Sequence, residues 1–291
     1  MNRYIKLLFV FIFSGCIIAY TNLFNRSFLQ DYCSFHDNDN ESLNENDTLK
    51  TLIPLTNDLD SLELCRGDGV KKCIPPLMKY KQLYRTSKEN NLIACVIEKT
   101  FSTFLTAIMC FLHDQTAFRD SNRTLESDIY GERLCKDQNE FTELKKIGNW
   151  QKMSLFAVVR NPIDRFVSGF TDKCLREKVW KKYKQRCAQY DFRRCEFSSH
   201  LVKYQILQLD GANFPDQLLG LLEEQGLDEE GIKFINGSLH HRTPHSTMDS
   251  VERATVEETV LNSPYLLRKI TQMYYFDFLL FGYRLPEIPR V

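Results

Sequence analysis

Two short apolar runs, each followed by a polar turn and a longer apolar stretch, form the clearest pattern in the chain. Residues 92–97 (LIACVI) and 155–159 (LFAVV) are rich in β-branched side chains, which is typical of buried strands. Residues 102–112 (STFLTAIMCFL) are apolar nearly all round and predict a buried helix. We expect Ser102 or Thr103 to cap the start of that helix.

The second apolar run leads into a second predicted helix. Asn161 and Pro162 supply an N-cap and a first-turn proline, and the helical pattern runs to about Cys174. Two strand–turn–helix units of this kind predict an α/β domain with a doubly wound, mostly parallel sheet flanked by helices. No internal repeat interrupts the pattern.

The N-terminus carries a different apolar pattern. Arg3 and Lys6 precede an uncharged, largely apolar run from Leu7 to Phe24, whose 18 residues are near the shortest length that spans a bilayer. A basic flank that stays in the cytoplasm then predicts an uncleaved signal anchor over residues 1–24, with the rest of the chain in the lumen.

Two other interpretations of this segment compete with the anchor. A cleaved signal peptide needs small residues before the cut, and Ala19 and Thr21 are the only candidates. The stretch Ser14–Cys16 looks like a bacterial lipoprotein site, which the glycosylation sequons of the chain disfavour.

An acidic, weakly apolar segment follows the anchor. Residues 31–60 hold eight acidic side chains and one lysine, so they bury too little apolar surface to offset their ordering entropy. We therefore expect a flexible luminal stem over residues 25–61 and a single domain over residues 62–291.

The composition of the chain says more about the cellular compartment of the protein than about its function. The 291 residues carry 38 basic and 38 acidic side chains, so the formal net charge is zero. Many nucleic-acid-binding proteins are instead basic overall, which argues against that class. Ten cysteines occur without a Cys-x-x-Cys pair, so we expect no metal site. Together with the apolar N-terminus, five Asn-x-Ser/Thr sequons favour the secretory pathway: Asn25, Asn40, Asn46, Asn122 and Asn236.

The first motif with chemical potential is Glu98-Lys-Thr-Phe-Ser-Thr103, between the first predicted strand and its helix. Such a junction offers free backbone N–H groups and the positive end of a helix dipole to an anion. Lys99 adds a point charge. No glycine occurs between Gly69 and Gly131, so the loop lacks the pattern of an ordinary nucleoside-triphosphate site. The alternative is a polar turn with a surface lysine.

The second motif is Arg160-Asn-Pro-Ile-Asp-Arg-Phe-Val-Ser168, at the end of the second predicted strand. Ligands of open α/β sheets bind at such strand ends. Arg160 and Ser168 could share one phosphate, with bidentate bonds from the guanidinium. The alternative is that Arg160 makes only a structural pair with Asp164.

Together the two motifs resemble the paired signature of the sulfotransferase superfamily, and most closely the membrane-anchored carbohydrate sulfotransferases of the chondroitin/dermatan type. The stretches Ser168–Cys174 and Tyr274–Tyr283 look like further segments of that family. The resemblance covers roughly residues 92–283. It implies a P-loop-like fold and the sulfuryl donor 3′-phosphoadenosine-5′-phosphosulfate (PAPS). It also implies a Golgi membrane protein of single-pass type II topology.

The resemblance also implies roles for individual residues. Lys99 would lie at the bridging oxygen of the leaving group, and the loop residues Thr100, Ser102 and Thr103 would hold the 5′-phosphate. Arg160 and Ser168 would hold the 3′-phosphate. A general base should take the acceptor's proton, and the sequence leaves three candidates, with His245 preferred: His113, His200 and His245.

One position departs from the family pattern. The family usually has proline immediately before the loop lysine, where this chain has Glu98. A carboxylate beside an anionic co-substrate should weaken its binding unless it points away or pairs with a cation. The competing hypothesis is therefore a non-catalytic luminal protein of the same fold that binds glycan or PAPS without turnover. A kinase-like transferase that uses ATP is disfavoured, because the chain lacks the Gly-rich phosphate-binding loop of such enzymes.

The expected acceptor is an anionic, chondroitin-like glycosaminoglycan. Residues 173–194 hold nine basic side chains, with Trp180 and Tyr183 among them, which suits either a groove for such a chain or a solvated helix face. Cys174, Cys187 and Cys195 lie around this segment as the expected disulfide partners, whereas buried Cys95 and Cys110 suit small apolar residues. A homodimer is left open.

Overall fold

The computed structural model describes residues 64–74, 82–128, 133–178, 195–241, 243 and 246–289. The chain divides into two compact units, the first comprising Met1–Ile53 with Lys173–Asp191, and the second Pro54–Asp172 with Phe192–Val291. Only residues 173–178 of the first unit are described. The predicted anchor, stem and most of the basic stretch therefore lie outside the described residues. Among the described helices, none combines the length and apolarity that crossing a membrane would require.

The second unit is built on a five-stranded sheet of order β3-β1-β2-β4-β5. The strands are β1 (Tyr84–Ser87), β2 (Leu92–Cys95), β3 (Glu140–Phe141), β4 (Ser154–Val159) and β5 (Tyr204–Gln208). β2, β4 and β5 are parallel, whereas β1 pairs antiparallel with both β2 and β3. The expected mostly parallel sheet is thus a mixed one. A four-residue turn between β1 and β2 permits only an antiparallel pair, because a parallel crossover needs a dozen residues or more.

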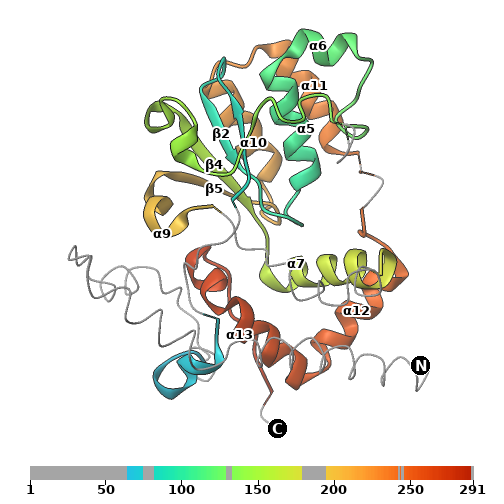
Figure 1. Ribbon diagram of the computed structural model, residues 1–291. Coiled ribbons are helices and arrows are strands. Elements are labelled where there is room, and N and C mark those ends of the chain that lie inside the picture. The colour runs from blue at the N-terminus through green and yellow to red at the C-terminus, as the bar shows by residue number, and fades with distance from the viewer. Residues whose placement is uncertain are drawn as a thin grey trace, which may run out of the picture. The chain divides into compact units, whose positions relative to one another are not determined.

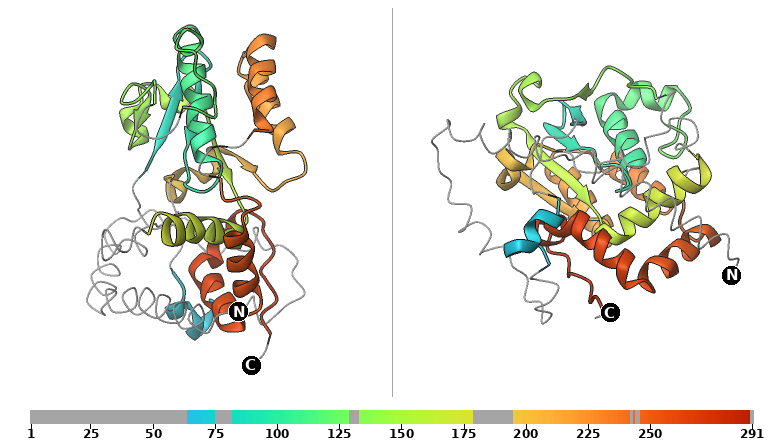
Figure 2. Two further views of the ribbon diagram at one scale, coloured as in Figure 1. Left: turned by 90° about the vertical axis from the view of Figure 1, so that its right-hand side faces the viewer. Right: turned by 60° about the horizontal axis from the view of Figure 1, so that its bottom comes forward.

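Four helices cover one face of the sheet (Figures 1 and 2). They are α5 (Ser102–His113), α6 (Gln115–Asp120), α10 (Phe214–Glu224) and α11 (Glu229–Leu239). Alternate residues of the parallel strands, Ala94 and Phe156 among them, point into this core. The predicted strands and first helix are confirmed within two residues at each end. β2 and α5 are continuous apolar runs because both are buried on every side.

Shorter segments cover the opposite face. They include α9 (Phe197–His200) and the end of α13 (Pro264–Leu280), whereas η3 (Trp150–Lys152) and η5 (Leu201–Lys203) come directly before β4 and β5. Phe197 packs its ring on Tyr204, with centroids 4.8 Å apart, and on Phe281, at 5.4 Å. The hydroxyl of buried Tyr84 accepts from the Glu196 backbone N–H at 3.1 Å. Burial raises the pKa of Tyr84 to about 12, so its phenol stays protonated.

A second group of helices lies beyond the carboxyl end of β4 (Figure 1). It consists of α7 (Pro162–Gly169), α12 (Val251–Leu261) and α13, which pack against one another. Arg165 of α7 donates to Asp277 of α13 at 2.8 Å and stacks over the Tyr274 ring. The pair is almost fully buried, so removing either partner would leave an uncompensated charge between α7 and α13. The remaining elements are η1 (Gly67–Lys72), η2 (Leu144–Lys146) and the π-helix η4 (Phe170–Arg176).

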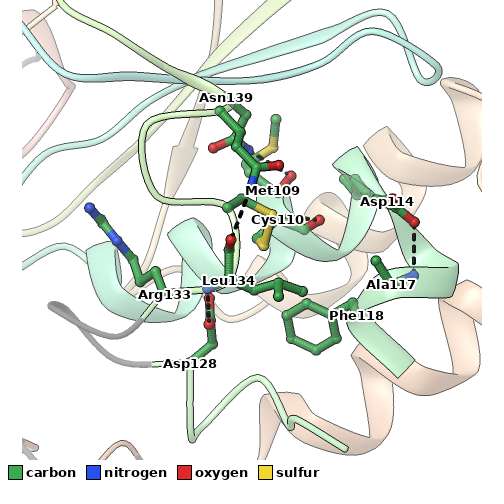
Figure 3. The surroundings of a disulfide bond; sticks show 12 residues. Met109, Cys110, Asp114, Ala117, Phe118, Asp128, Arg133, Leu134 and Asn139 are labelled. Atoms are coloured by element: carbon green, nitrogen blue, oxygen red, sulfur yellow. Dashed lines mark hydrogen bonds between the residues drawn. A yellow bond between two sulfur atoms is a disulfide. The ribbon is translucent and has the colours of Figure 1, made fainter. Parts of the chain in front are cut away.

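Three disulfides join the described cysteines: Cys65–Cys73, Cys95–Cys195 and Cys110–Cys135. The expectation of reduced, apolar cysteines at Cys95 and Cys110 is wrong, because burial suits a disulfide as well as a thiol. The expectation that Cys195 forms a disulfide is confirmed, and its partner is Cys95. Figure 3 shows the surroundings of the bond at Cys110, where the Asn139 amide donates to the Met109 carbonyl at 3.1 Å.

Candidate active site

The loop between β2 and α5 has an unusual backbone. Lys99 and Phe101 both have positive φ, at 63° and 66°, a region that non-glycine residues seldom occupy. Thr100 between them is fully buried, and its hydroxyl donates to the Ile97 carbonyl at 2.6 Å. The Thr100 N–H points to the same carbonyl at 3.4 Å. Thr100 therefore helps to fix the shape of the loop, and its contact with the 5′-phosphate stays a prediction.

The N-terminus of α5 is open. Its N-cap is Phe101, and no side chain in the described part of the chain caps it. The predicted cap at Ser102 or Thr103 is wrong, because both residues already belong to the first helical turn. Their half-buried hydroxyls therefore stay available, and the first-turn N–H groups have no partner within the helix. A helix of 12 residues with an uncapped start is suited to an anion.

Lys99 forms an ion pair with Asp172 in the π-helix η4, which directly follows α7. The Lys99 side chain is 17% exposed and that of Asp172 is 5% exposed. The segment after the second motif therefore reaches back to the lysine of the first. Sequence reasoning missed Asp172, although it lies in the Ser168–Cys174 stretch that resembles the family.

Arg160 follows β4 and is largely buried, with 13% of its side chain exposed. Burial lowers the pKa of its guanidinium, and attraction by Asp164 opposes that shift. The two side chains approach within 3.5 Å, so the structural pair weighed from the sequence is present. Asp164 is also 2.8 Å from Arg253 of α12. Arg160 and Arg253 therefore share the Asp164 carboxylate.

Helix α7 presents Ser168 from the same face as Asp164, one turn further on. Asn161 accepts from the Ile163 N–H at 3.0 Å, which confirms the predicted cap and first-turn proline. Ser168 is buried, and its hydroxyl lies 3.3 Å from that of Thr247. The strand β4, its turn and α7 thus carry both predicted phosphate ligands of the second motif.

The candidate bases are placed differently. His113 ends α5, and the helix rise of about 1.5 Å per residue puts it roughly 16 Å along the axis from the loop of Lys99. The His200 ring packs at a tilt against that of Trp150, with centroids 4.9 Å apart, and lies 3.8 Å from Glu196. It precedes the amino end of β5, whereas the two motifs follow the carboxyl ends of β2 and β4. His245 lies outside the described residues and stays a prediction.

Comparisons with known proteins agree with this arrangement. Residues 82–205 and 180–284 match the sulfotransferase family. Three similar proteins come from Caenorhabditis elegans. An uncharacterized protein is 23% identical over 89% of both chains. The putative sulfotransferase vep-2 is 28% identical over 68% of this chain and 74% of its own length. The carbohydrate sulfotransferase chst-1 is 25% identical over 73% and 79%.

No solved structure matches the chain significantly. The family match nevertheless spans both motifs, every strand of the described sheet and the helices that hold the second motif. The chain belongs to the sulfotransferase family.

Proposed function

We propose that the chain transfers the sulfuryl group of PAPS to a hydroxyl of a glycan. The observation that carries this proposal is the ion pair between Lys99 and Asp172 beside the open N-terminus of α5. It brings the lysine loop together with the segment that follows Arg160 and Ser168. A relative named as a carbohydrate sulfotransferase supports a sugar acceptor.

The residues present suit a donor with phosphate at both ends of its ribose. PAPS would supply the activated sulfuryl group. Ser102 and Thr103, with the free N–H groups of the first α5 turn, would hold the 5′-phosphate. Arg160 and Ser168 would hold the 3′-phosphate by charge-assisted hydrogen bonds. Holding both ends orients the donor for in-line attack by the acceptor hydroxyl.

Lys99 would stabilise the negative charge that develops on the leaving oxygen. Its ammonium is held in a largely buried position by Asp172, where a cation acts more strongly than in water. The proton of the acceptor hydroxyl needs a base. We keep His245 in that role as a proposal.

The acceptor and the compartment are parts of the same proposal. A chondroitin-like glycosaminoglycan remains the expected acceptor, on the resemblance in sequence. A Golgi location with a type II anchor would put the domain in an oxidising lumen, which suits the three disulfides. Two of the five sequons, Asn122 and Asn236, are described, and both side chains are exposed.

A non-catalytic binding protein is the second candidate, and Glu98 favours it. The half-buried Glu98 directly precedes Lys99 in the loop, so its charge could oppose the binding of an anionic donor. Lys99, Arg160 and Ser168 are all present, which favours the enzyme.

The deciding experiment incubates the full chain with radiolabelled PAPS and a panel of desulfated glycosaminoglycans, chondroitin among them. The enzyme is expected to label at least one acceptor, and the Lys99→Ala variant provides the background. PAPS binding without label on any acceptor would establish the binding protein instead. Absence of both would contradict the proposal entirely.

A further inference from the structure

A second arginine contacts the carboxylate of the Arg160 motif. Arg253 of α12 donates from Nη2 to Asp164 Oδ1 at 2.8 Å. Its side chain is 12% exposed, and its Nη1 is buried without a hydrogen-bond partner among the described residues. A buried guanidinium N–H without an acceptor is costly, because the group has lost its water. This side of Arg253 therefore needs an acceptor.

A second residue near the start of α12 contacts the other end of the Arg160–Ser168 motif. Thr247, which is 4% exposed, lies 3.3 Å from Ser168. Asp164 and Ser168 are one turn apart on α7, so residues 247–253 follow the helix face that carries both motif residues. Figure 1 shows α12 beside α7, and the two helices are in contact. The segment thus joins the motif at two points.

The charges at this place are not balanced by Asp164 alone. Arg160 and Arg253 share its carboxylate, and Arg253 is among the groups that lower the pKa of Arg160. Two further carboxylates lie near. Glu257 is 3.7 Å from Arg253 and 39% exposed, and Asp210 raises the pKa of Arg160 as Asp164 does. The need for an additional ligand therefore rests mainly on the Nη1 of Arg253, which lacks a partner within the described part of the chain. Two neighbouring, poorly solvated guanidinium groups of like charge would be stabilised by an additional anion.

We infer that Arg253 and Thr247 complete the site of the 3′-phosphate, with Arg253 as a direct ligand. This inference rests on the proposed use of PAPS. A phosphate monoester presents three acceptor oxygens and nearly two negative charges. Arg160 and Arg253 supply the two positive charges, and Ser168 and Thr247 supply hydroxyl donors. The region after α11 therefore contributes to donor selection, which neither sequence motif indicates.

The test compares two nucleotides that differ only in the 3′-phosphate. Calorimetric titration of the full chain gives the Kd of adenosine 3′,5′-bisphosphate and of adenosine 5′-monophosphate. Arg253→Gln is expected to weaken the bisphosphate about 10- to 100-fold, the value of one charged hydrogen-bonding contact, and to leave the monophosphate unchanged. Thr247→Val should weaken the bisphosphate by about threefold to tenfold. Arg268→Gln, at an exposed position of α13, is the matched control and should change neither.

Each outcome decides between the alternatives. Equal losses for both nucleotides, or none, in Arg253→Gln would mean that Arg253 only anchors α12 to α7, and would overturn the inference. If Arg253→Gln does not fold, the decision passes to Arg253→Lys, which keeps the charge but loses the planar fork, and to Thr247→Val. Unchanged bisphosphate affinity in both would overturn it equally. A wild-type chain that binds the two nucleotides alike would instead refute the proposed donor, and the inference with it.

Discussion

The disulfide between Cys95 and Cys195 is expected to stabilise the domain more than the other two. It closes a loop of 100 residues and holds the end of β2, directly before the loop of Lys99. The perturbation is the double substitution Cys95→Ala with Cys195→Ala. The matched control is Cys65→Ala with Cys73→Ala, which opens a loop of 8 residues. All four cysteines are buried, so the packing lost with the sulfur atoms is similar.

The magnitude follows from the chain entropy that each bond removes from the unfolded state. For a loop of about 100 residues this amounts to about 4.7 kcal/mol, and for a loop of about 8 residues to about 2.5 kcal/mol. The difference of roughly 2.2 kcal/mol depends only on the ratio of the loop lengths. In a domain of this size, about 1 kcal/mol shifts the Tm by about 2–4 °C. The Cys95/Cys195 variant should therefore melt about 4–9 °C below the control.

The assay is thermal unfolding followed by circular dichroism, on variants whose remaining disulfides are verified by non-reducing peptide mapping. Wild type treated with a reductant should melt below both variants. A Cys65/Cys73 variant that melts at or below the Cys95/Cys195 variant would refute the entropic reasoning. Peptide mapping that finds Cys95 as a thiol in wild type would refute the pairing itself.

Four further predictions concern the site and the topology. Lys99→Ala should lower kcat much more than donor affinity, because leaving-group charge is larger in the transition state; wild-type turnover in this variant would contradict the role of Lys99. Glu98→Pro should leave activity unchanged or raise it, and transfer by this variant alone would identify the natural chain as a binding protein. Arg160→Lys should weaken PAPS about 10- to 100-fold but affect an analogue without the 3′-phosphate less; the same loss for both would make Arg160 structural. An anchored chain should carry glycosidase-sensitive glycans, and a secreted protein beginning near residue 21 would contradict the anchor; the expected sites are Asn46, Asn122 and Asn236.

The parts of the fold that sequence reasoning predicted are those with a continuous apolar pattern. β2, α5 and β4 are each buried on all sides, so their composition alone indicates them. β1 was not predicted because its sequence, YRTS, is largely polar, although all four residues are buried. Arg85 is fully buried there and pairs with Glu140 at 3.1 Å. A buried polar residue whose partner is distant in sequence cannot be recognised from its neighbours in sequence.

The same distinction holds at the candidate site. The two motifs are local in sequence, so Lys99, Arg160 and Ser168 could be selected from their position after predicted strands. Their partners are distant: Asp172 is 73 residues from Lys99, and Arg253 is 89 residues from Asp164. The first contact depends on where η4 lies relative to the Lys99 loop, and the second on how α7 and α12 pack, which no local pattern encodes.

Asp210, just after β5, links residues near the end of the chain to the turn that follows Arg160. Its Oδ1 accepts from the Tyr283 hydroxyl at 2.7 Å and from the Asn161 backbone N–H at 3.3 Å. Gln208 donates to the Phe281 carbonyl at 2.6 Å beside it. In genetic terms, a stop codon at Tyr283 would spare every residue of both motifs and still remove a support of the turn that follows Arg160. Late truncating alleles should therefore resemble substitutions of Arg160 itself rather than neutral trimming of a tail.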